Sequence, residues 1–407
     1  MPHHQCGLLP DTADFLPIVP RSSFESLKSF FSEYTGKGGW IDVGTLPPSK
    51  TSELRQIAKE IMGQDRDIQC GHPLVNVSGT IDTTARTIIP DKDKLLEYCF
   101  WENDVVSSGA LNDFNFEKEN WEWVAKSFQR LAISHPDALA ASKTNCCQRL
   151  AFLDIGVNVG DWISPIRLLA PNTVPIYGIE GSPATAAIAT ANLHTSSLYM
   201  AKEDQKTCSK LLPFTMATES RVPVIHREGG VCFSQVQDSY VRGSIRKFNI
   251  GGRHVADVQM NQCQKAADIA GATTLEHAIE SLCPSNTIPK VYILKIDIEG
   301  FEFKAISSVI SSWLTKAPPC YFAMEVWKNQ YSYIALVETL LTVVGYDVVW
   351  RPRQREYPHN TEPWLKGLSG TQKEMREVMS AADSGYTELI FGFSDADICV
   401  DNLMSAD

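Results

Sequence analysis

A glycine-rich turn at residues 154–161 joins an apolar run to a helix-like segment, and few folds contain such a junction. Residues 150–154 have the composition of a buried strand, and apolar side chains recur at helical spacing over 159–169. Gly156 and Gly160 allow a sharp turn and a close approach of the backbone to a ligand. The start of the helix offers free amide groups to an anion. The junction therefore predicts a β-α unit with a ligand at the carboxyl end of its strand.

Two acidic residues flank this unit. Glu180 ends the next apolar run, 174–179, where a doubly wound sheet places an acid that accepts hydrogen bonds from both hydroxyls of a ribose. Asp154 comes two positions before the first glycine and suits a ligand that carries an ammonium group. The pattern G-x-G-x-x-G is absent, which disfavours a nicotinamide-dependent oxidoreductase. The acids predict an adenosine-containing cofactor; the alternatives are a surface glutamate and a purely structural turn.

Strand-like and helix-like segments alternate from about residue 148 onward, as in a β-α-β series with a parallel sheet. The predicted strands are 150–154, 174–179, 291–296, 321–326, 347–350 and 387–393, the last antiparallel beside the final parallel strand. The predicted helices are 159–169, one opening at Ser182-Pro183, 275–282, 301–314 and 333–344. Pro165 is tolerated in the first helix only if that helix begins late. We expect an α/β domain at 148–407 and a mainly helical accessory region at 1–147.

Carboxylates follow the strongest predicted strand, in the run Lys295-Ile-Asp-Ile-Glu-Gly-Phe-Glu302. Ligands of open α/β sheets bind at the carboxyl ends of strands, so Asp297 and Glu299 are expected at the reacting centre, where they can orient a hydroxyl or take its proton. Glu325 ends the next strand and can join them. The alternatives are a divalent cation held by Asp297 and Glu325, and structural caps. His194 and His226 are alternative bases.

These motifs resemble those of the FkbM family of methyltransferases. The resemblance rests on D-I-G-x-N-x-G at 154–160, E-G-S-P at 180–183, Asn192, Thr274-Leu-Glu276, L-K-I-D-I-E-G-F-E at 294–302, Met324-Glu325 and Gly345-Tyr346. It covers about residues 148–395, and the stretch from 221 to 271 follows no pattern of the family.

The resemblance implies a Rossmann-like class I methyltransferase fold with S-adenosylmethionine as cofactor. It implies methyl transfer to a hydroxyl of a sugar, a glycan or a small metabolite. The residues that it assigns to the cofactor are Asp154, Gly156, Asn158, Gly160, Glu180, Gly181 and Ser182, with Met216 and Ala217 beside the adenine. A fold that binds a partner without catalysis is the alternative.

The formal net charge of −11 disfavours a nucleic-acid substrate, because an acidic surface repels phosphate groups. The eleven cysteines include no C-x-x-C, which favours reduced, buried thiols over a disulfide framework. No signal peptide and no apolar run long enough to cross a membrane are found in the sequence. These observations predict a cytoplasmic protein. The oligomeric state and the acceptor are left open.

Overall fold

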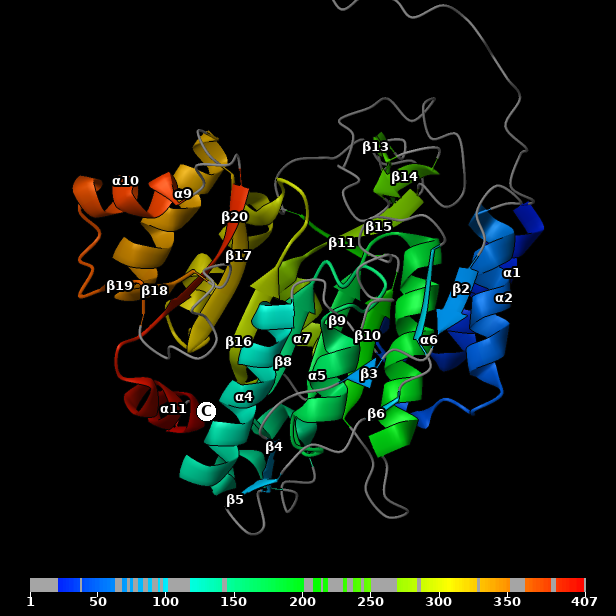
Figure 1. Ribbon diagram of the computed structural model, residues 1–407, viewed down its shortest axis with the longest axis horizontal. Coiled ribbons are helices and arrows are strands. Elements are labelled where there is room, and N and C mark those ends of the chain that lie inside the picture. The colour runs from blue at the N-terminus through cyan, green and yellow to red at the C-terminus, as the bar shows by residue number, and fades with distance from the viewer. Residues whose placement is uncertain are drawn as a thin grey trace, which may run out of the picture.

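A central sheet flanked by helices organises the computed structural model (Figure 1). The structure describes residues 21–405 with gaps, of which the longest are 102–117, 219–229, 250–268 and 352–362. The shorter gaps are 37–38, 63–67, 72–73, 76–79, 83–86, 90–93, 96–97, 141–144, 201–207, 214, 233–236, 243–244, 284–286, 328–329 and 382–385.

Nine strands of the described chain form this sheet, in the order β1-β10-β9-β8-β16-β17-β20-β18-β19. Neighbours from β10 to β17 are parallel, whereas β20 runs antiparallel between β17 and β18. The strands are β1 (Ile41–Asp42), β8 (Ala151–Ile155), β9 (Ile176–Glu180), β10 (Ser209–Pro213), β16 (Val291–Ile296), β17 (Tyr321–Trp327), β18 (Val348–Trp350), β19 (Leu365–Lys366) and β20 (Tyr386–Gly392). The predicted mostly parallel sheet and its antiparallel last strand are confirmed.

The central strands β8 and β16 are buried along their whole length. Successive side chains point to opposite faces, so Phe152 and Ile293 enter one apolar core while Leu153 and Leu294 enter the other. Both faces are covered, as a parallel sheet requires, and this explains why these strands are apolar without alternation.

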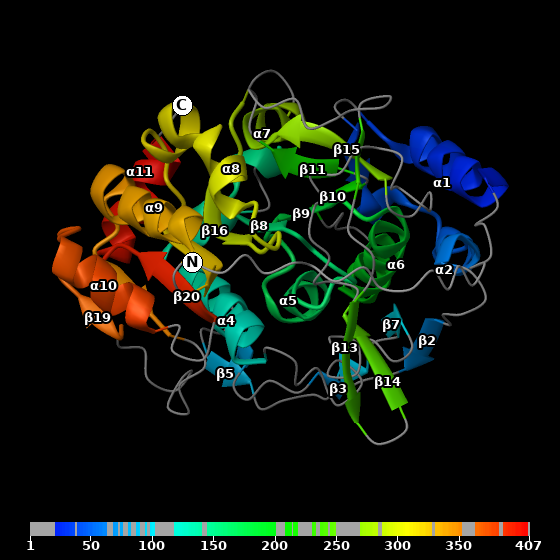
Figure 2. The same cartoon turned by 90° about the horizontal axis from the view of Figure 1, so that it is seen from above.

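Helices cover the two faces in two layers (Figure 2). One layer contains α4 (Lys118–Ser134), α5 (Ile163–Leu169), α6 (Pro183–Met200) and α11 (Ala396–Ser405). The other contains α7 (Leu275–Leu282), α8 (Glu302–Ser307), α9 (Tyr331–Thr339) and α10 (Gln372–Ser380). The helix α5 begins at Ile163, which leaves Pro165 in its first turn, where proline is tolerated. Within the described ranges, no helix is long and apolar enough to cross a membrane.

Two helices end in π-helical segments, Ile310–Leu314 after α8 and Leu340–Val344 after α9. The second stops at Gly345, whose φ of 87° is the left-handed conformation expected of a helix-ending glycine. The sequence predicts one helix over 301–314 and one over 333–344. In the structure each of them is an α-helix that continues into a π-helical segment.

The N-terminal region packs onto the same core instead of standing apart. The helix α2 (Lys50–Met62) packs against α6, α1 (Arg21–Tyr34) packs against α2, and β1 adds an antiparallel edge to β10 (Figure 1). Short strands form three antiparallel pairs: β2 (Ile68–Gly71) with β7 (Tyr98–Trp101), β3 (Leu74–Val75) with β6 (Lys94–Leu95), and β4 (Thr80–Asp82) with β5 (Thr87–Ile89). The 3-10 turns are Val43–Thr45, Pro136–Leu139 and Cys146–Gln148. In its described residues the region is therefore mixed: α1, α2 and α4 match the mainly helical expectation, and the short strands do not.

Two small sheets occupy the connection between β10 and α7, the stretch that follows no predicted pattern. They are β11 (Thr215–Thr218), β15 (Ile269–Thr274) and β12 (Gly230–Cys232), and the pair β13 (Gln237–Arg242) and β14 (Ile245–Asn249).

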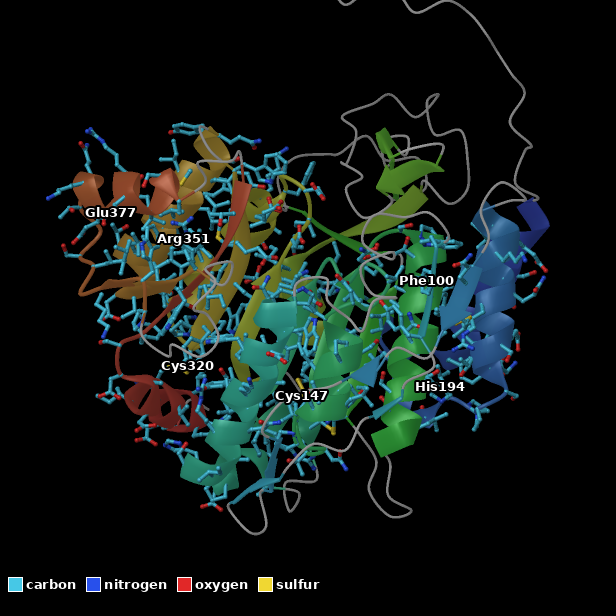
Figure 3. All side chains as sticks on the ribbon, in the orientation of Figure 1. Phe100, Cys147, His194, Cys320, Arg351 and Glu377 are labelled. Carbon is cyan, nitrogen blue, oxygen red and sulfur yellow. A yellow bond between two sulfur atoms is a disulfide. The ribbon has the colours of Figure 1, made fainter. Side chains whose placement is uncertain are left out.

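Four disulfides within the described residues contradict the prediction of reduced thiols. They join Cys70 to Cys99, Cys146 to Cys208, Cys147 to Cys283 and Cys320 to Cys399 (Figure 3). The sequence could not reveal these pairs, because their partners are 29 to 136 residues apart and form no local motif. Such cross-links are rare in the cytosol, so the cytoplasmic expectation loses the support that it took from the cysteines.

Candidate active site

The glycine-rich turn after β8 depends on three residues with positive φ: Gly156 at 87°, Asn158 at 54° and Gly160 at 88°. A Cβ atom on Gly156 would lie 1.8 Å from the main-chain oxygen of Asp297. The Gly156 amide donates to the main-chain oxygen of Ile179 at 2.9 Å. Only glycine fits at 156, because the turn is packed directly against the loop that follows β16.

Glu180, at the end of β9, holds the turn and the start of α6 together. One carboxylate oxygen accepts from the Asn158 amide and the other from the Ser182 amide, each at 2.8 Å. A carboxylate offers about four lone-pair positions, so both oxygens can accept further hydrogen bonds. Burial raises the pKa of Glu180 to about 7, although the two amides favour its ionised form.

The start of α6 matches its prediction. Ser182 precedes Pro183, the first helical residue, and the Ser182 main-chain oxygen accepts from the Ala186 amide at 2.8 Å. Gly181 and Ser182 are buried beside Glu180. The four residues from 180 to 183 thus present a carboxylate and a helix N-terminus at the same edge of the sheet.

A lysine on β16 links the two loops. The Lys295 ammonium lies 3.2 Å from the Asp154 carboxylate, 3.7 Å from that of Asp297 and 5.2 Å from the centre of the Trp162 ring. It also donates to the Gly156 main-chain oxygen at 3.2 Å. Asp154 is fully buried, and its carboxylate is paired with the Lys295 ammonium in this structure.

The turn after β16 is strained and internally supported. Glu299 has a φ of 54°, which is uncommon for a residue other than glycine, and Gly300 follows at 98°. The buried carboxylate of Glu302 accepts from the Ile298 and Gly300 amides at 2.9 and 3.0 Å, so Glu302 supports the turn. Burial raises the pKa of Glu299 to about 8, and the negative charge of Asp297 adds to the rise.

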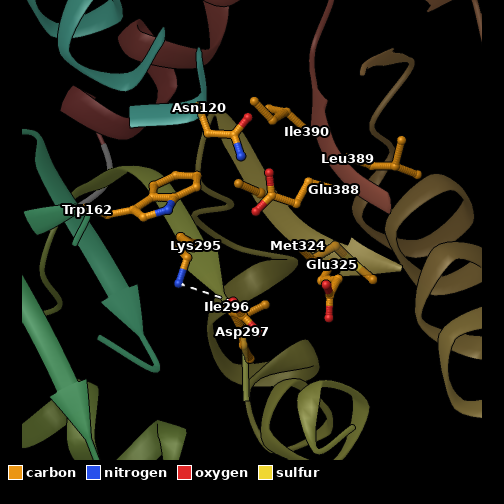
Figure 4. A pocket seen from close by; sticks show the side chains of 11 residues that line it. Asn120, Trp162, Lys295, Ile296, Asp297, Met324, Glu325, Glu388, Leu389 and Ile390 are labelled. Atoms are coloured by element: carbon orange, nitrogen blue, oxygen red, sulfur yellow. Dashed lines mark ion pairs between the residues drawn. The ribbon is translucent and has the colours of Figure 1, made fainter. Parts of the chain in front are cut away.

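A cavity opens beside this turn, at the carboxyl ends of β16 and β17 (Figure 4). Polar and aromatic side chains line it: Asn120, Trp162, Lys295, Asp297, Glu325 and Glu388. Of the two carboxylates predicted to be catalytic, Asp297 lines the cavity and Glu299 lies two residues further along the turn. Glu325 joins Asp297 there, as the sequence suggested.

Two of the six lining residues carry no signal that sequence reasoning could have used. Asn120 belongs to α4 and Glu388 to β20, and neither stands in a recognisable motif. Lys295 lies within the motif at 294–302, and Trp162 directly follows the turn at 154–161. The structure shows that the Lys295 ammonium lies over the Trp162 ring.

Of the two histidine alternatives, His194 does not reach this site. The His194 ring is buried, with Nδ1 2.7 Å from the Thr51 hydroxyl and Nε2 2.9 Å from the Leu46 main-chain oxygen, and burial lowers its pKa. His194 is therefore wrong as a candidate base: it joins α2 to α6. His226 lies outside the described residues.

Met216 and Ala217 form part of β11, which pairs in parallel with β15. Their side chains lie outside the described part of the structure, so their predicted place beside the adenine stays a prediction. As for a metal, no group of three or more histidine, cysteine, aspartate or glutamate side chains within the described ranges is arranged to hold an ion.

Residues 154–348 match the sequence profile of the methyltransferase FkbM domain. No curated protein matches the chain in sequence.

Solved structures that resemble it include phosphoethanolamine N-methyltransferase 2 of Haemonchus contortus with S-adenosyl-L-methionine, at 12% identity and a TM-score of 0.28 over 92% of this chain and 81% of that one. The same enzyme with phosphomonomethylethanolamine and S-adenosylhomocysteine matches at 10% identity and a TM-score of 0.25 over the same shares. These TM-scores are too low to inform the substrate. By the profile match, residues 154–348 form a methyltransferase domain of the FkbM family, for which S-adenosylmethionine is the methyl donor.

Proposed function

We propose that this protein transfers a methyl group from S-adenosylmethionine to a hydroxyl of a sugar, a glycan or a small metabolite. The observation that carries the proposal is the contact between Gly156 and the main-chain oxygen of Asp297. This contact supports the proposal, because the glycine-rich turn packs directly against the loop whose Asp297 side chain lines the cavity. Holding donor and acceptor side by side supplies much of the rate enhancement of a displacement reaction.

The residues around Glu180 suit the cofactor. Each Glu180 oxygen accepts one backbone amide and has room for a ribose hydroxyl as well. The side-chain oxygen of Asn158 is buried and, in the described structure, has no hydrogen-bond partner, so it is available to a ligand. The residues proposed to hold the cofactor are Asp154, Gly156, Asn158, Gly160, Glu180, Gly181, Ser182, Met216 and Ala217. Asp154 acts in this scheme by fixing Lys295.

Asp297 is the proposed base. S-adenosylmethionine supplies an electrophilic methyl group, and a hydroxyl becomes a sufficient nucleophile when a base accepts its proton. Asp297 lines the cavity and lies 3.7 Å from the Lys295 ammonium, which fixes its orientation. When Glu299 ionises, its carboxylate adds a negative charge beside Asp297.

The disulfides favour maturation in an oxidising compartment. Four cross-links within the described residues suit the secretory pathway, the cell exterior or a periplasm, where such bonds form and persist. This proposal replaces the cytoplasmic expectation.

Calorimetric titration with S-adenosylmethionine and S-adenosylhomocysteine tests the cofactor site. Micromolar binding is expected for the wild type, and Glu180→Ala should weaken it at least tenfold, about 1.4 kcal/mol. Because the ionised carboxylate accepts the ribose hydroxyls, the wild-type affinity should also fall as the pH drops below about 7. The control is Glu377→Ala, at an exposed position of α10, which should bind like the wild type. Absence of binding by the wild type would refute the proposal.

A further inference from the structure

An unpaired amide marks one wall of the cavity beside Asp297. Asn120 is 1% exposed, and neither its side-chain nitrogen nor its oxygen has a hydrogen-bond partner within the described chain. A buried amide without partners costs about 1–3 kcal/mol, so native structures rarely keep one. Figure 4 shows this amide pointing into the cavity toward Glu388. The free nitrogen and oxygen of this amide indicate a binding position for a group that both donates and accepts hydrogen bonds.

Another wall carries two carboxylates from neighbouring strands. Glu388 on β20 is the register partner of Glu325 on β17, and like charges directly opposite each other destabilise a sheet. Glu388 is 7% exposed, and one Glu325 oxygen accepts from the Trp327 ring nitrogen at 2.7 Å. With Asp297, three carboxylates line the cavity against the single ammonium of Lys295. The cavity therefore favours hydrogen-bond donors and repels anions.

The size of the cavity limits what enters it. Its volume of about 10 Å³ holds roughly one water molecule, and a hydroxyl group has the same size and the same capacity to donate and accept. The Trp162 ring forms an apolar wall beside this space.

We propose that Asn120 and Glu388 bind a non-reacting hydroxyl of the acceptor, adjacent to the hydroxyl that faces Asp297. The acceptor is then an uncharged polyhydroxylated molecule such as a glycoside, and phosphorylated or carboxylated sugars are excluded. This inference rests on the proposed function and names its substrate class. Both residues lie outside residues 154–348, the segment that matches the family profile.

Methyl transfer to defined sugars tests the inference, once calorimetry has shown that S-adenosylmethionine binds. The neutral probes are the methyl glycosides of glucose, galactose, mannose, fucose and xylose, and the anionic probes are glucuronate and glucose 6-phosphate. The wild type should methylate at least one neutral glycoside and neither anion. For that glycoside, Asn120→Ala and Glu388→Gln should raise KM at least tenfold and leave the affinity for S-adenosylmethionine unchanged.

A deoxy probe identifies the hydroxyl that Asn120 and Glu388 bind. The deoxy analogue that lacks the hydroxyl next to the methylated one should be a poor acceptor for the wild type. The same analogue should show no further loss with Asn120→Ala, because that variant has already lost the contact.

Gln129→Ala is the matched control. Gln129 lies on the same helix, is equally buried at 1% exposed, and donates to the Leu169 main-chain oxygen away from the cavity. It should lower the melting temperature without changing KM. Glu388→Gln keeps the shape of the side chain, so its result stands even if Asn120→Ala fails to fold.

Three results would overturn the inference while leaving the proposed function intact. They are methylation of an anionic probe, an unchanged KM in Asn120→Ala and Glu388→Gln, and no glycoside methylated by a protein that binds S-adenosylmethionine. Absence of S-adenosylmethionine binding would overturn both.

Discussion

Glu299 combines a backbone conformation and a charge state that are both unusual for glutamate. Its φ of 54° is sterically costly, and burial raises the pKa of its side chain to about 8. The neighbouring Gly300, with a φ of 98°, and the hydrogen bonds of Glu302 hold this conformation in place. Strain that the surroundings maintain at the mouth of a site points to a functional role for the residue.

The rate of methyl transfer should rise with pH through a midpoint of about 8. Ionised Glu299 places a second negative charge beside Asp297, where the acceptor hydroxyl gives up its proton. We expect Glu299→Gln to remove this rise and keep a low constant rate, and Asp297→Asn to abolish turnover at every pH. The measurement is kcat from about pH 6 to 9.5; an unchanged rise in Glu299→Gln would show that another group titrates.

The same titration acts in the opposite direction on stability. Between pH 4.5 and about 8 the folded protein retains a proton at Glu299 that the unfolded chain has lost. Stability is therefore lost as pH rises through this window.

Replacement of Gly156 by alanine should damage the fold more than the same change at Gly345. Both glycines have a φ of 87°, but only at 156 would the new Cβ meet another atom, the Asp297 main-chain oxygen at 1.8 Å. Backbone strain is common to both, so the difference isolates the clash, about 1–3 kcal/mol or more. Chemical unfolding of the two variants measures it. Equal losses would mean that the two loops are not packed as described.

Among the elements, α6 ties the N-terminal region to the glycine turn through one side chain. Asn192 donates to the Cys99 main-chain oxygen at 2.7 Å and to that of Val159 at 2.8 Å, and it accepts from the Cys99 amide at 2.9 Å. Strand β7 and the cofactor turn therefore share an anchor.

Asn192→Leu should lower the free energy of unfolding by roughly 3 kcal/mol, because three hydrogen bonds to buried backbone groups are lost, although the Val159 oxygen keeps the Tyr98 hydroxyl as a donor. It should also weaken S-adenosylmethionine binding, since Val159 belongs to the turn. Thr190→Val is the control: Thr190 is equally buried on α6 but makes one hydrogen bond, to Ala186, so the expected loss is about 1 kcal/mol with unchanged binding. Denaturation and calorimetry together decide; equal effects of the two variants would contradict the anchor.

Elements with a strong local pattern could be predicted from the sequence. The apolar run 291–296 coincides with β16, and 275–282 with α7, because strand burial on two faces and a capped amphipathic helix leave clear patterns. The π-helical ends of α8 and α9 could not be predicted, since a wider turn keeps almost the same apolar spacing.

The site was predictable to the extent that its residues occur in motifs. Glu180 and Asp297 were placed correctly at the carboxyl ends of their strands, because the order of strand, turn and helix fixes that edge. The contribution of Asn120 and Glu388 depends on how α4 and β20 pack, and nothing in the neighbourhood of either residue encodes that packing.

At the scale of the whole molecule, three of the four disulfides in the described residues lie away from the site. Cys146 and Cys147 precede β8, Cys208 precedes β10 and Cys320 precedes β17, so these cross-links gather at the amino ends of parallel strands (Figure 3). The carboxyl ends, where Asp297 and Glu325 lie, carry none of these three cross-links.

Alkylation under denaturing conditions should modify at least eight more cysteines after reduction than before it, as intact mass will show. Reduction should lower the melting temperature strongly, because each of these loops stabilises the fold by about 3–5 kcal/mol in the chain-entropy account. Retention of catalysis below the new melting temperature is expected, since the bonds do not touch the cavity. Eight cysteines modified without reduction would contradict the pairing.

The close packing of Gly156 on Asp297 has an evolutionary consequence. The turn at 154–161 is proposed to bind the methyl donor and the loop after β16 to bind the acceptor. Because no side chain fits between them at Gly156, a mutation that moves one of these loops requires a compensating mutation in the other. Selection for a new acceptor is thereby directed away from this contact. Asn120 and Glu388, on elements outside it, are the positions at which descendants of this protein can diversify without disturbing the donor.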